Sequence, residues 1–389
     1  MSNWLLPEYI QDVLPDEAWC IEQMRARILE RLRVSGYQLV SPPMLEYVES
    51  LLINGSRDMD LRTFKLVDQL SGRTLALRAD ITPQVARIDA HLLNRQGVTR
   101  LCYAGSVLHT QPVGLSPSRE LLQIGAELYG VSGLDADLEI QHLMLELLDL
   151  LGIGGVHLDL AHVGVFRALV RDAGIAADLE ATLFGVLQRK DMTELRELLA
   201  GLPADKQAPL LALPGLYGKA DDVLARARKL LPSLPEITAA LDALQAAADA
   251  VGVLAQEVGI DLAELRGYHY HSGMVFAAYH AGSHDAIALG GRYDELGKGF
   301  GRARAATGFS MDLRQLYRLS LPVTTPKGIL VPQRSDTDLQ EKIAALRAQG
   351  EIVVVDLLGD LAHRAELNCD RELVLCDGSW MIVELKNQE

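Results

Sequence analysis

The segment RLCYAGSVLHTQPVGLSPSRELLQIGAELYG, residues 100–130, decides the fold. Its two ends, TRLCYAGSVLHT and ELLQIGAELYG, have the composition of strands. The loop QPVGLSPSR between them is rich in proline, glycine and serine, the residues typical of turns. A second hairpin is predicted upstream, where RTFKLVD and RTLALRAD flank the turn QLSG. These strands predict an antiparallel sheet.

Helices are predicted on either side of these strands. Residues 14–35 predict an amphipathic helix, because apolar residues recur at helical spacing at Leu14, Ile21, Met24, Ile28 and Leu32. The short strand YQLVSPP follows, and a further helix opens at residues 80–82, with Pro83 suited to its first turn. Antiparallel strands with helices segregated around them predict an α+β core rather than a doubly wound parallel sheet.

The composition along the chain predicts two domains. Residues 166–257 are rich in alanine, leucine and charged residues and predict a helical insertion. Strands return at GMVFAAYH and AIALGG, and GFSMDLRQLYRL predicts a final helix. After the linker LPVTTPKG, the pattern GILVP, DLQEKIAALRAQG, EIVVVDL predicts a small βαβ unit. We therefore predict a core domain of residues 1–322 and a small α/β domain of residues 327–389.

Composition points to a cytoplasmic protein without a membrane span. Hydrophobic residues make up 49% and charged residues 23% of the chain. Neither a signal peptide nor an apolar run of about 18 residues is visible. The four cysteines are scattered, as free thiols in a reducing compartment are. The formal net charge of −15 argues against a long contact with tRNA, whose phosphates favour basic surfaces.

Glycine-rich and histidine-rich stretches carry no nucleotide or metal motif. The spacing from Gly291 to Lys298 is one residue too long for a Walker loop, and Gly297, Gly299 and Gly301 miss the dinucleotide fingerprint. Zinc is conceivable at His269, His271, His280 and His284, but no cysteine or carboxylate stands at useful spacing. Tight turns and ordinary polar histidines are the favoured interpretations, so we predict neither a metal nor a cofactor.

Residues 100–130 resemble motif 2 of the class II histidyl-tRNA synthetases, and the match has no gap. LALRADITPQVAR resembles the family's strand and helix start, and ELRGYHYHSGMVF resembles its histidine-specific segment. LGGRYDEL and ATGFSMDLRQL resemble the following glycine strand and motif 3. These matches follow the family's order across roughly residues 8–320. The resemblance implies a class II synthetase-like antiparallel sheet flanked by helices.

The resemblance also implies that the ATP site has been lost. His109 stands where the family's motif 2 arginine holds the α-phosphate, and Gln111 replaces a nearby glutamate. Gln315 stands where the motif 3 arginine holds the γ-phosphate. A neutral histidine and a glutamine cannot replace two bidentate phosphate donors. We therefore expect almost no adenylation activity.

The histidine pocket, by the same resemblance, is retained. It is implied to use Asp80, Thr82 and Gln123 for the α-amino group, Glu127 for the imidazole, Arg266 for the carboxylate and Tyr270 as lining. His271 replaces the second tyrosine of the family's pair. Taken singly, Glu127 or Arg266 could equally form a structural buried ion pair, so that interpretation stays open.

The segments VSPPMLEYVESLL, LRADITPQVARI and RGYHYHSGMVF resemble the regulatory subunits of ATP phosphoribosyltransferase, which are non-catalytic relatives of the synthetase. This resemblance implies a partner, the short-form catalytic subunit, and a role in the first step of histidine biosynthesis with feedback by histidine. It also implies a homodimer core within a hetero-octamer, without tRNA. Two alternatives remain: a divergent adenylating enzyme using His109 in a new way, and a scaffold subunit without ligand sensing.

Overall fold

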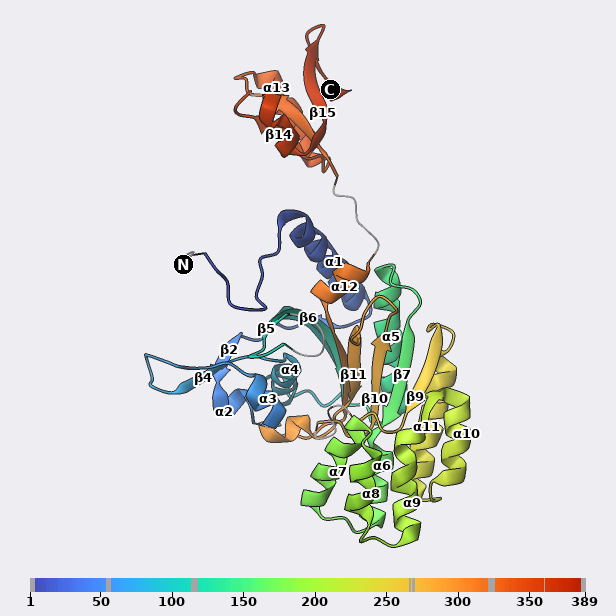
Figure 1. Cartoon of the computed structure of the whole chain (residues 1–389). Helices are drawn as coiled ribbons and strands as arrows, with labels where there is room; N and C mark the ends of the chain where they lie inside the picture. The colour runs from blue at the N-terminus through green and yellow to red at the C-terminus, as the bar shows by residue number, and fades with distance from the viewer. Residues whose placement is uncertain are drawn as a thin grey trace. The chain divides into compact units, whose positions relative to one another are not determined.

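The computed structural model describes residues 4–53, 57–112, 118–265, 267, 270–320, 326–359 and 361–385. The chain divides into two compact units, Met1–Leu321 and Pro322–Glu389 (Figure 1). Each unit has its own sheet and its own hydrophobic core.

The first unit is built on a nine-stranded sheet of order β1-β5-β6-β12-β11-β10-β7-β9-β8. Its pairs are antiparallel except β1 with β5 and β7 with β9. The strands are β1 (Gln38–Leu39), β5 (Thr99–Leu108), β6 (Glu120–Tyr129), β7 (His157–His162), β8 (Tyr217–Lys219), β9 (Glu257–Asp261), β10 (Met274–Tyr279), β11 (Ala288–Arg292) and β12 (Ala306–Asp312). The hairpin predicted at residues 100–130 is confirmed as β5 and β6, which are paired in register along their whole length.

A smaller sheet of order β2-β4-β3 lies between β1 and β5 in the chain. It consists of β2 (Leu45–Tyr47), β3 (Lys65–Val67) and β4 (Thr74–Leu77). The antiparallel pairing of β3 with β4 confirms the predicted upstream hairpin. The short helices α2 (Val48–Leu51) and α3 (Arg57–Arg62) lie between β2 and β3 in the chain.

Helices cover the two faces of the large sheet. Helices α1 (Pro15–Val34) and α5 (Leu134–Leu150) contribute to the main core, together with Ile124, Ala126 and Leu128 of β6. Helix α4 (Thr82–Arg87) contributes to a second core with Leu101 and Tyr103 of β5, and η1 (Ile88–Leu93) and η3 (Leu296–Phe300) join the same side. The predicted helix at residues 14–35 is confirmed as α1, and its apolar stripe is buried from Ile21 to Leu32.

Between β7 and β9 the chain is mainly helical (Figure 1). The elements are α6 (Val163–Asp172), α7 (Ala177–Arg189), α8 (Met192–Leu199), α9 (Ala204–Ala212), η2 (Leu213–Gly215), α10 (Ala220–Leu230) and α11 (Pro235–Val251). Strand β8 interrupts them and pairs with β9 at the edge of the large sheet. Its three residues are all exposed, so no hydrophobic pattern marks it in the sequence.

The helix predicted at GFSMDLRQLYRL is wrong in its first half. Residues up to Asp312 belong to strand β12, and only α12 (Leu313–Leu319) is helical. Strand β12 lies between β6 and β11 and is buried on both faces, so its residues lack the alternation that marks a strand. The strand ends at Asp312, whose side chain accepts a hydrogen bond from the Arg314 backbone N–H at 3.2 Å and caps α12.

The second unit has a four-stranded sheet of order β14-β13-β15-β16. Its elements are β13 (Gly328–Pro332), α13 (Thr337–Ala348), β14 (Val353–Asp356), η4 (Leu361–Leu367), β15 (Cys369–Cys376) and β16 (Ser379–Glu384). The parallel pairing of β13 with β14 across α13 confirms the predicted βαβ pattern. In the described parts of both units, no helix has the length and apolar character needed to cross a membrane.

The ion pair between Arg292 and Asp137 ties strand β11 to helix α5. The Arg292 Nε donates to Asp137 at 3.1 Å, and the two side chains are 8% and 7% exposed. The Arg292→Leu substitution leaves a buried carboxylate without its cation, which we expect to cost about 3–5 kcal/mol of the free energy of unfolding. Urea unfolding measures the free energy of unfolding of the variant and of wild type. Arg25→Leu, which breaks the exposed Arg25–Glu22 pair, should cost less than about 1 kcal/mol. Equal losses in the two variants would contradict the prediction.

Candidate ligand-binding site

One face of the β5–β6 pair carries the polar residues predicted for the ligand pocket. Leu101 lies opposite Glu127, and Gly105 lies opposite Gln123. Directly paired residues of antiparallel strands project to the same face, and alternate residues along a strand share a face. Gln123 and Glu127 therefore project together. Residues 80–82, which lead into α4, meet them through a hydrogen bond from the Ile81 backbone N–H to Gln123 Oε1 at 2.9 Å.

Glu127 is the centre of this site and is 1% exposed. The Tyr103 hydroxyl donates to its Oε1 at 3.1 Å, and the Tyr293 hydroxyl donates to its Oε2. Gly308 of β12 lies opposite Glu127, and a Cβ atom there would collide with the carboxylate. Among the described residues, no lysine or arginine pairs with Glu127. In the described part of the chain, tyrosine hydroxyls rather than a cation surround this carboxyl group.

Burial changes the acid–base properties of the cluster. It raises the pKa of Glu127 to about 8, although the tyrosine hydrogen bonds act in the opposite direction. Burial also raises the pKa of Tyr103 and Tyr293 well above the ordinary tyrosine value. Glu127 therefore holds its proton over most of the neutral range until a partner for the carboxylate arrives.

Asp80, Gln123 and Thr82 form a second polar group that is joined to the first. Asp80 Oδ1 accepts from Gln123 Nε2 at 2.8 Å and from the Thr82 backbone N–H at 3.1 Å. The Thr82 hydroxyl lies 3.1 Å from the Tyr103 hydroxyl, which reaches Glu127. The network thus brings four predicted pocket residues together, with an acidic group at each end.

Tyr270 presents an unsatisfied hydroxyl to this cluster. Its ring centroid lies 5.1 Å from that of Tyr293. Its hydroxyl is enclosed and has no hydrogen-bond partner in the described part of the chain. Burial is the main cause of the raised pKa of this hydroxyl, and the charges of Asp80 and Glu127 raise it further. The hydroxyl therefore lies within electrostatic reach of both carboxyl groups. An enclosed hydroxyl without a partner is costly, and a polar ligand would relieve that cost.

His271 and Arg266 complete the predictions on this side of the site. The His271 ring packs edge-on against Tyr270 at 5.2 Å between centroids, and burial lowers its pKa to about 4. His271 is therefore a neutral packing residue beside the pocket. Arg266 lies outside the described residues, so its assignment to a ligand carboxylate stays a prediction.

His109 is a buried imidazole at the position where the family resemblance places an arginine. The Nε2 donates to the Ala79 carbonyl at 2.8 Å, which leaves Nδ1 with a lone pair. This Nδ1 is enclosed and has no partner among the described residues, and the side chain is 6% exposed. Burial also lowers the pKa of the imidazole. In this state the ring offers a phosphate neither a positive charge nor a second donor nitrogen.

Gln315 uses its amide within the protein. The Nε2 donates to the Ser283 hydroxyl at 3.0 Å and to the Ala286 carbonyl at 3.2 Å. These bonds attach α12 to the loop that precedes β11. The side chain therefore supports the local fold, and it has no charge to offer a phosphate.

The sequence prediction missed Tyr103, Tyr293 and Gly308. Tyr103 was open to prediction, because it lies two residues from both Leu101 and Gly105 on a strand and so shares their face. Tyr293 lies in the quoted segment LGGRYDEL but directly follows β11, so only the folded sheet places it beside Glu127. Gly308 required the register of β12 against β6.

Two family models match the chain, one in each unit. Residues 9–316 match the model described as histidyl-tRNA synthetase. Residues 326–383 match the model described as the ATP phosphoribosyltransferase subunit HisZ C-terminal domain. The synthetase-type model covers the whole ligand site, and the second model covers nearly all of the small α/β unit.

Solved structures define the class of protein. A histidyl-tRNA synthetase from Nostoc superposes with a TM-score of 0.78 over 99% of this chain and 97% of its own, at 21% identity, which shows the fold alone. A Bacillus halodurans protein described as an ATP phosphoribosyltransferase regulatory subunit/histidyl-tRNA synthetase superposes with a TM-score of 0.83. The identity is 28%, over 96% of this chain and 98% of the other. The fold is that of the class II histidyl-tRNA synthetases.

Sequence relatives narrow this class to one family. The ATP phosphoribosyltransferase regulatory subunit of Nitrosospira multiformis is 57% identical over 99% of both chains. That of Paraburkholderia phymatum is 58% identical over 100% of both chains. The chain belongs to the family of ATP phosphoribosyltransferase regulatory subunits. Its relatives carry the name of a regulatory rather than a catalytic subunit, and histidine biosynthesis is their pathway.

The buried Glu127 gives the stability of the protein a defined dependence on pH. An unfolded glutamate loses its proton near pH 4.5, whereas the folded one keeps it up to about pH 8. Between these values the folded state binds more protons, so Glu127 lowers the free energy of unfolding as the pH rises. Glu127→Gln should therefore stabilise the protein more at pH 8 than at pH 5. The difference in the free energy of unfolding between variant and wild type should grow by at least about 1 kcal/mol between the two pH values.

Scanning calorimetry at the two pH values measures this difference. Glu22→Gln, at an exposed position on α1, is the matched control and should show no such dependence. A constant difference between wild type and Glu127→Gln across this range would mean that Glu127 is ionised throughout.

Proposed function

We propose that this chain is the regulatory subunit of a cytoplasmic ATP phosphoribosyltransferase complex and binds a short-form catalytic subunit. The observation that carries the proposal is the identity of 57–58% with regulatory subunits along the full chain. The site agrees with the proposal. The donor nitrogen of His109 is bonded to the Ala79 carbonyl, and the amide of Gln315 is bonded to the Ser283 hydroxyl. Those two features remove two of the phosphate contacts that amino-acid activation needs.

We further infer that free histidine is the ligand of the Asp80–Glu127 site. Histidine brings an ammonium group, for which the Asp80 carboxylate and Thr82 hydroxyl are suitable acceptors. It also brings an imidazole N–H, for which Glu127 is the suitable buried acceptor. The unsatisfied Tyr270 hydroxyl would gain a polar partner. Arg266 is assigned to the ligand carboxylate on the family resemblance.

The assembly we propose is a hetero-octamer built on a synthetase-like homodimer. The support is a set of large exposed apolar residues in the N-terminal segment, in α1 and in the edge strand β1. Trp4 is 80%, Leu14 69%, Trp19 58% and Leu39 58% exposed. Burial of these residues in a subunit contact would remove their apolar surface from water. We assign the homodimer contact to residues 14–43, because this helix and strand resemble motif 1 of the class II synthetases, the segment that carries the dimer interface in that family.

We propose no contact with tRNA. The net charge of −15 disfavours a phosphate backbone. The C-terminal unit matches the regulatory-subunit domain model rather than continuing the synthetase match. We assign the core domain to residues 1–322 and the small domain to residues 327–389.

Reconstitution tests the regulatory proposal. We expect a purified short catalytic subunit to gain activity when this chain is added, and histidine to inhibit the mixture more strongly than the catalytic subunit alone. Steady-state assays with and without the chain measure both effects. Identical activity and histidine sensitivity in the two cases would reject regulation. Histidine-dependent exchange of pyrophosphate into ATP by this chain would instead support the adenylating alternative.

Calorimetry with free histidine tests the pocket. Asp80→Asn keeps the shape of the side chain but removes the charge, so the ligand ammonium loses a charged hydrogen bond. We expect affinity to fall by about 10-fold to 100-fold, because such bonds contribute about 1.5–3 kcal/mol.

Asp242→Asn is the matched control, since Asp242 pairs with Arg228 at the surface of α11 and α10. It should bind histidine as wild type does. If wild type itself binds no histidine while reconstitution still succeeds, the scaffold alternative holds and the pocket assignment fails.

A further inference from the structure

Arg78 is a buried cation at the start of the ligand segment, which we define as residues 78–84. It is 6% exposed and precedes Asp80 by two residues. Its Nε donates to the Ser106 carbonyl and its Nη1 donates to the Pro42 carbonyl, each at 2.8 Å. Burial lowers the pKa of this guanidinium, because the charged form has lost contact with water.

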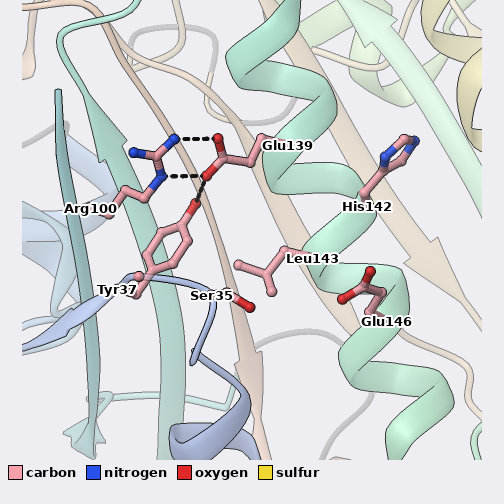
Figure 2. A pocket seen from close by; sticks show the side chains of 8 residues that line it. Ser35, Tyr37, Arg100, Glu139, His142, Leu143 and Glu146 are labelled. Carbon is pink, nitrogen blue, oxygen red and sulfur yellow. Dashed lines mark hydrogen bonds and ion pairs between the residues drawn. The ribbon is translucent and has the colours of Figure 1, made fainter. Parts of the chain in front are cut away.

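The partners of Arg78 differ from those of a neighbouring arginine on β5. Arg100 donates two hydrogen bonds of 2.7 Å to Glu139, and the Tyr37 hydroxyl donates to the same carboxylate at 2.9 Å (Figure 2). Arg78 has no carboxylate at ion-pair distance in the part of the chain that the structure describes. An apolar side chain would fill the same space without the cost of burying a charge. The two carbonyl bonds, rather than packing, therefore explain the arginine.

Strand β5 leaves space for this guanidinium. Gly105 lies opposite Gln123, so a side chain at Gly105 would project to the face that carries the ligand site. A Cβ atom there would collide with Arg78 Nη2 and would also contact the Ile81 side chain. Gln123 in turn accepts from the Ile81 backbone N–H at 2.9 Å and donates to Asp80 at 2.8 Å. The guanidinium therefore lies between β5 and the ligand segment.

The ligand segment is fastened to residues 42–46 at both of its ends. At the first end, the Arg78 backbone N–H donates to the Met44 carbonyl at 3.0 Å, in addition to the side-chain bond. At the other end, Gln84 is 1% exposed and its Nε2 donates to the Pro43 carbonyl at 2.7 Å. The two acceptors assigned to the ligand ammonium lie between these anchors in the chain.

From these contacts we propose that Arg78 is a positioning residue that couples the ligand site to Pro42. Its guanidinium holds Asp80 and Thr82 against β5 and ties them to the Pro42 carbonyl. Residues 14–43 are the segment assigned to the homodimer contact, so a change at that contact reaches the ligand acceptors through Arg78. The inference rests on the proposed function for the ligand and for the contact, whereas the bonds themselves join two segments of one chain.

Amide hydrogen exchange of the full-length protein without ligand tests the coupling. Arg78→Lys keeps the charge, but an ammonium group cannot reproduce the fork of a guanidinium that joins two carbonyls. Pro42→Gly keeps the carbonyl and frees the backbone that carries it. Each variant should lower the protection of the amides in residues 79–85 by about five-fold or more, the change expected from one lost hydrogen bond.

The double variant decides whether Arg78 carries the coupling. We expect Arg78→Lys with Pro42→Gly to lose less protection than the product of the two single effects, because both changes break the same bond. Losses that multiply would mean that the two residues act independently, and would overturn the proposal. If Arg78→Lys does not fold, Arg78→Met removes the buried charge, keeps the length of the side chain and takes its place in the same cycle.

Arg292→Lys is the matched control. Arg292 is also a buried arginine that donates to two backbone carbonyls, those of Val131 and Gly133, but it contacts neither the ligand segment nor residues 42–46 in the described ranges. It should leave the exchange of residues 79–85 unchanged. A loss of protection equal to that of Arg78→Lys would show a general loosening of the core and would contradict a specific role for Arg78.

Titration with histidine separates this inference from the proposed function. We expect Arg78→Lys to weaken histidine binding by about five-fold or more, and Arg292→Lys to bind histidine as wild type does. Equal binding by wild type and Arg78→Lys would show that Arg78 does not position the ligand acceptors. If wild type binds no histidine, the ligand assignment fails, and the exchange measurements still decide the role of Arg78.

Discussion

The buried carboxyl group of Glu127 is the constraint on which the ligand site depends. A glutamate without exposed surface must have partners, and three strands of the sheet supply its surroundings. Tyr103 comes from β5, Tyr293 follows β11, and Gly308 on β12 leaves the necessary space. The central strands must therefore keep their register for the carboxyl group to remain satisfied. A slip of one residue would turn Glu127 toward the α1–α5 core, where an apolar environment would make it very costly.

Most elements of the fold could be predicted from local patterns, and the failures share a cause. Helix α1 and the β5–β6 hairpin have one buried and one exposed side, so periodicity identifies them. Strand β12 is buried on both sides, and periodicity therefore confuses it with the helix that follows. Strand β8 has three exposed residues and is defined only by its bonds to β9. Periodicity of the sequence fails to predict a strand that has no contrast between a buried and an exposed face and is defined by its pairing with neighbouring strands.

The candidate site also has a part that could be predicted from the sequence and a part that needed the structure. Asp80, Thr82, Gln123 and Glu127 were predicted through the family resemblance, and the structure joins them in one network. The state of His109 needed the structure, because the bond from Nε2 to the Ala79 carbonyl decides which nitrogen keeps a lone pair. Residue type alone shows that an arginine is absent. The bond shows that the one donor nitrogen of the neutral ring is already used, so the ring has no donor left for a phosphate.

Under the proposed function, a histidine pocket beside a lost ATP site has a thermodynamic consequence. A ligand can shift an assembly only by the difference between its affinities for the two states of that assembly. Assembly must then change the ligand affinity by the same factor. The Tyr103–Glu127–Tyr293 contacts lie in the central strands, whose close packing resists gradual deformation. A change in histidine affinity between the two states is therefore more readily produced at residues 80–82, at the start of α4. Asp80 and Thr82 are held there by a few hydrogen bonds rather than by a sheet. Under the proposed function, movement of that segment against β6 is the change that would couple histidine to the catalytic partner.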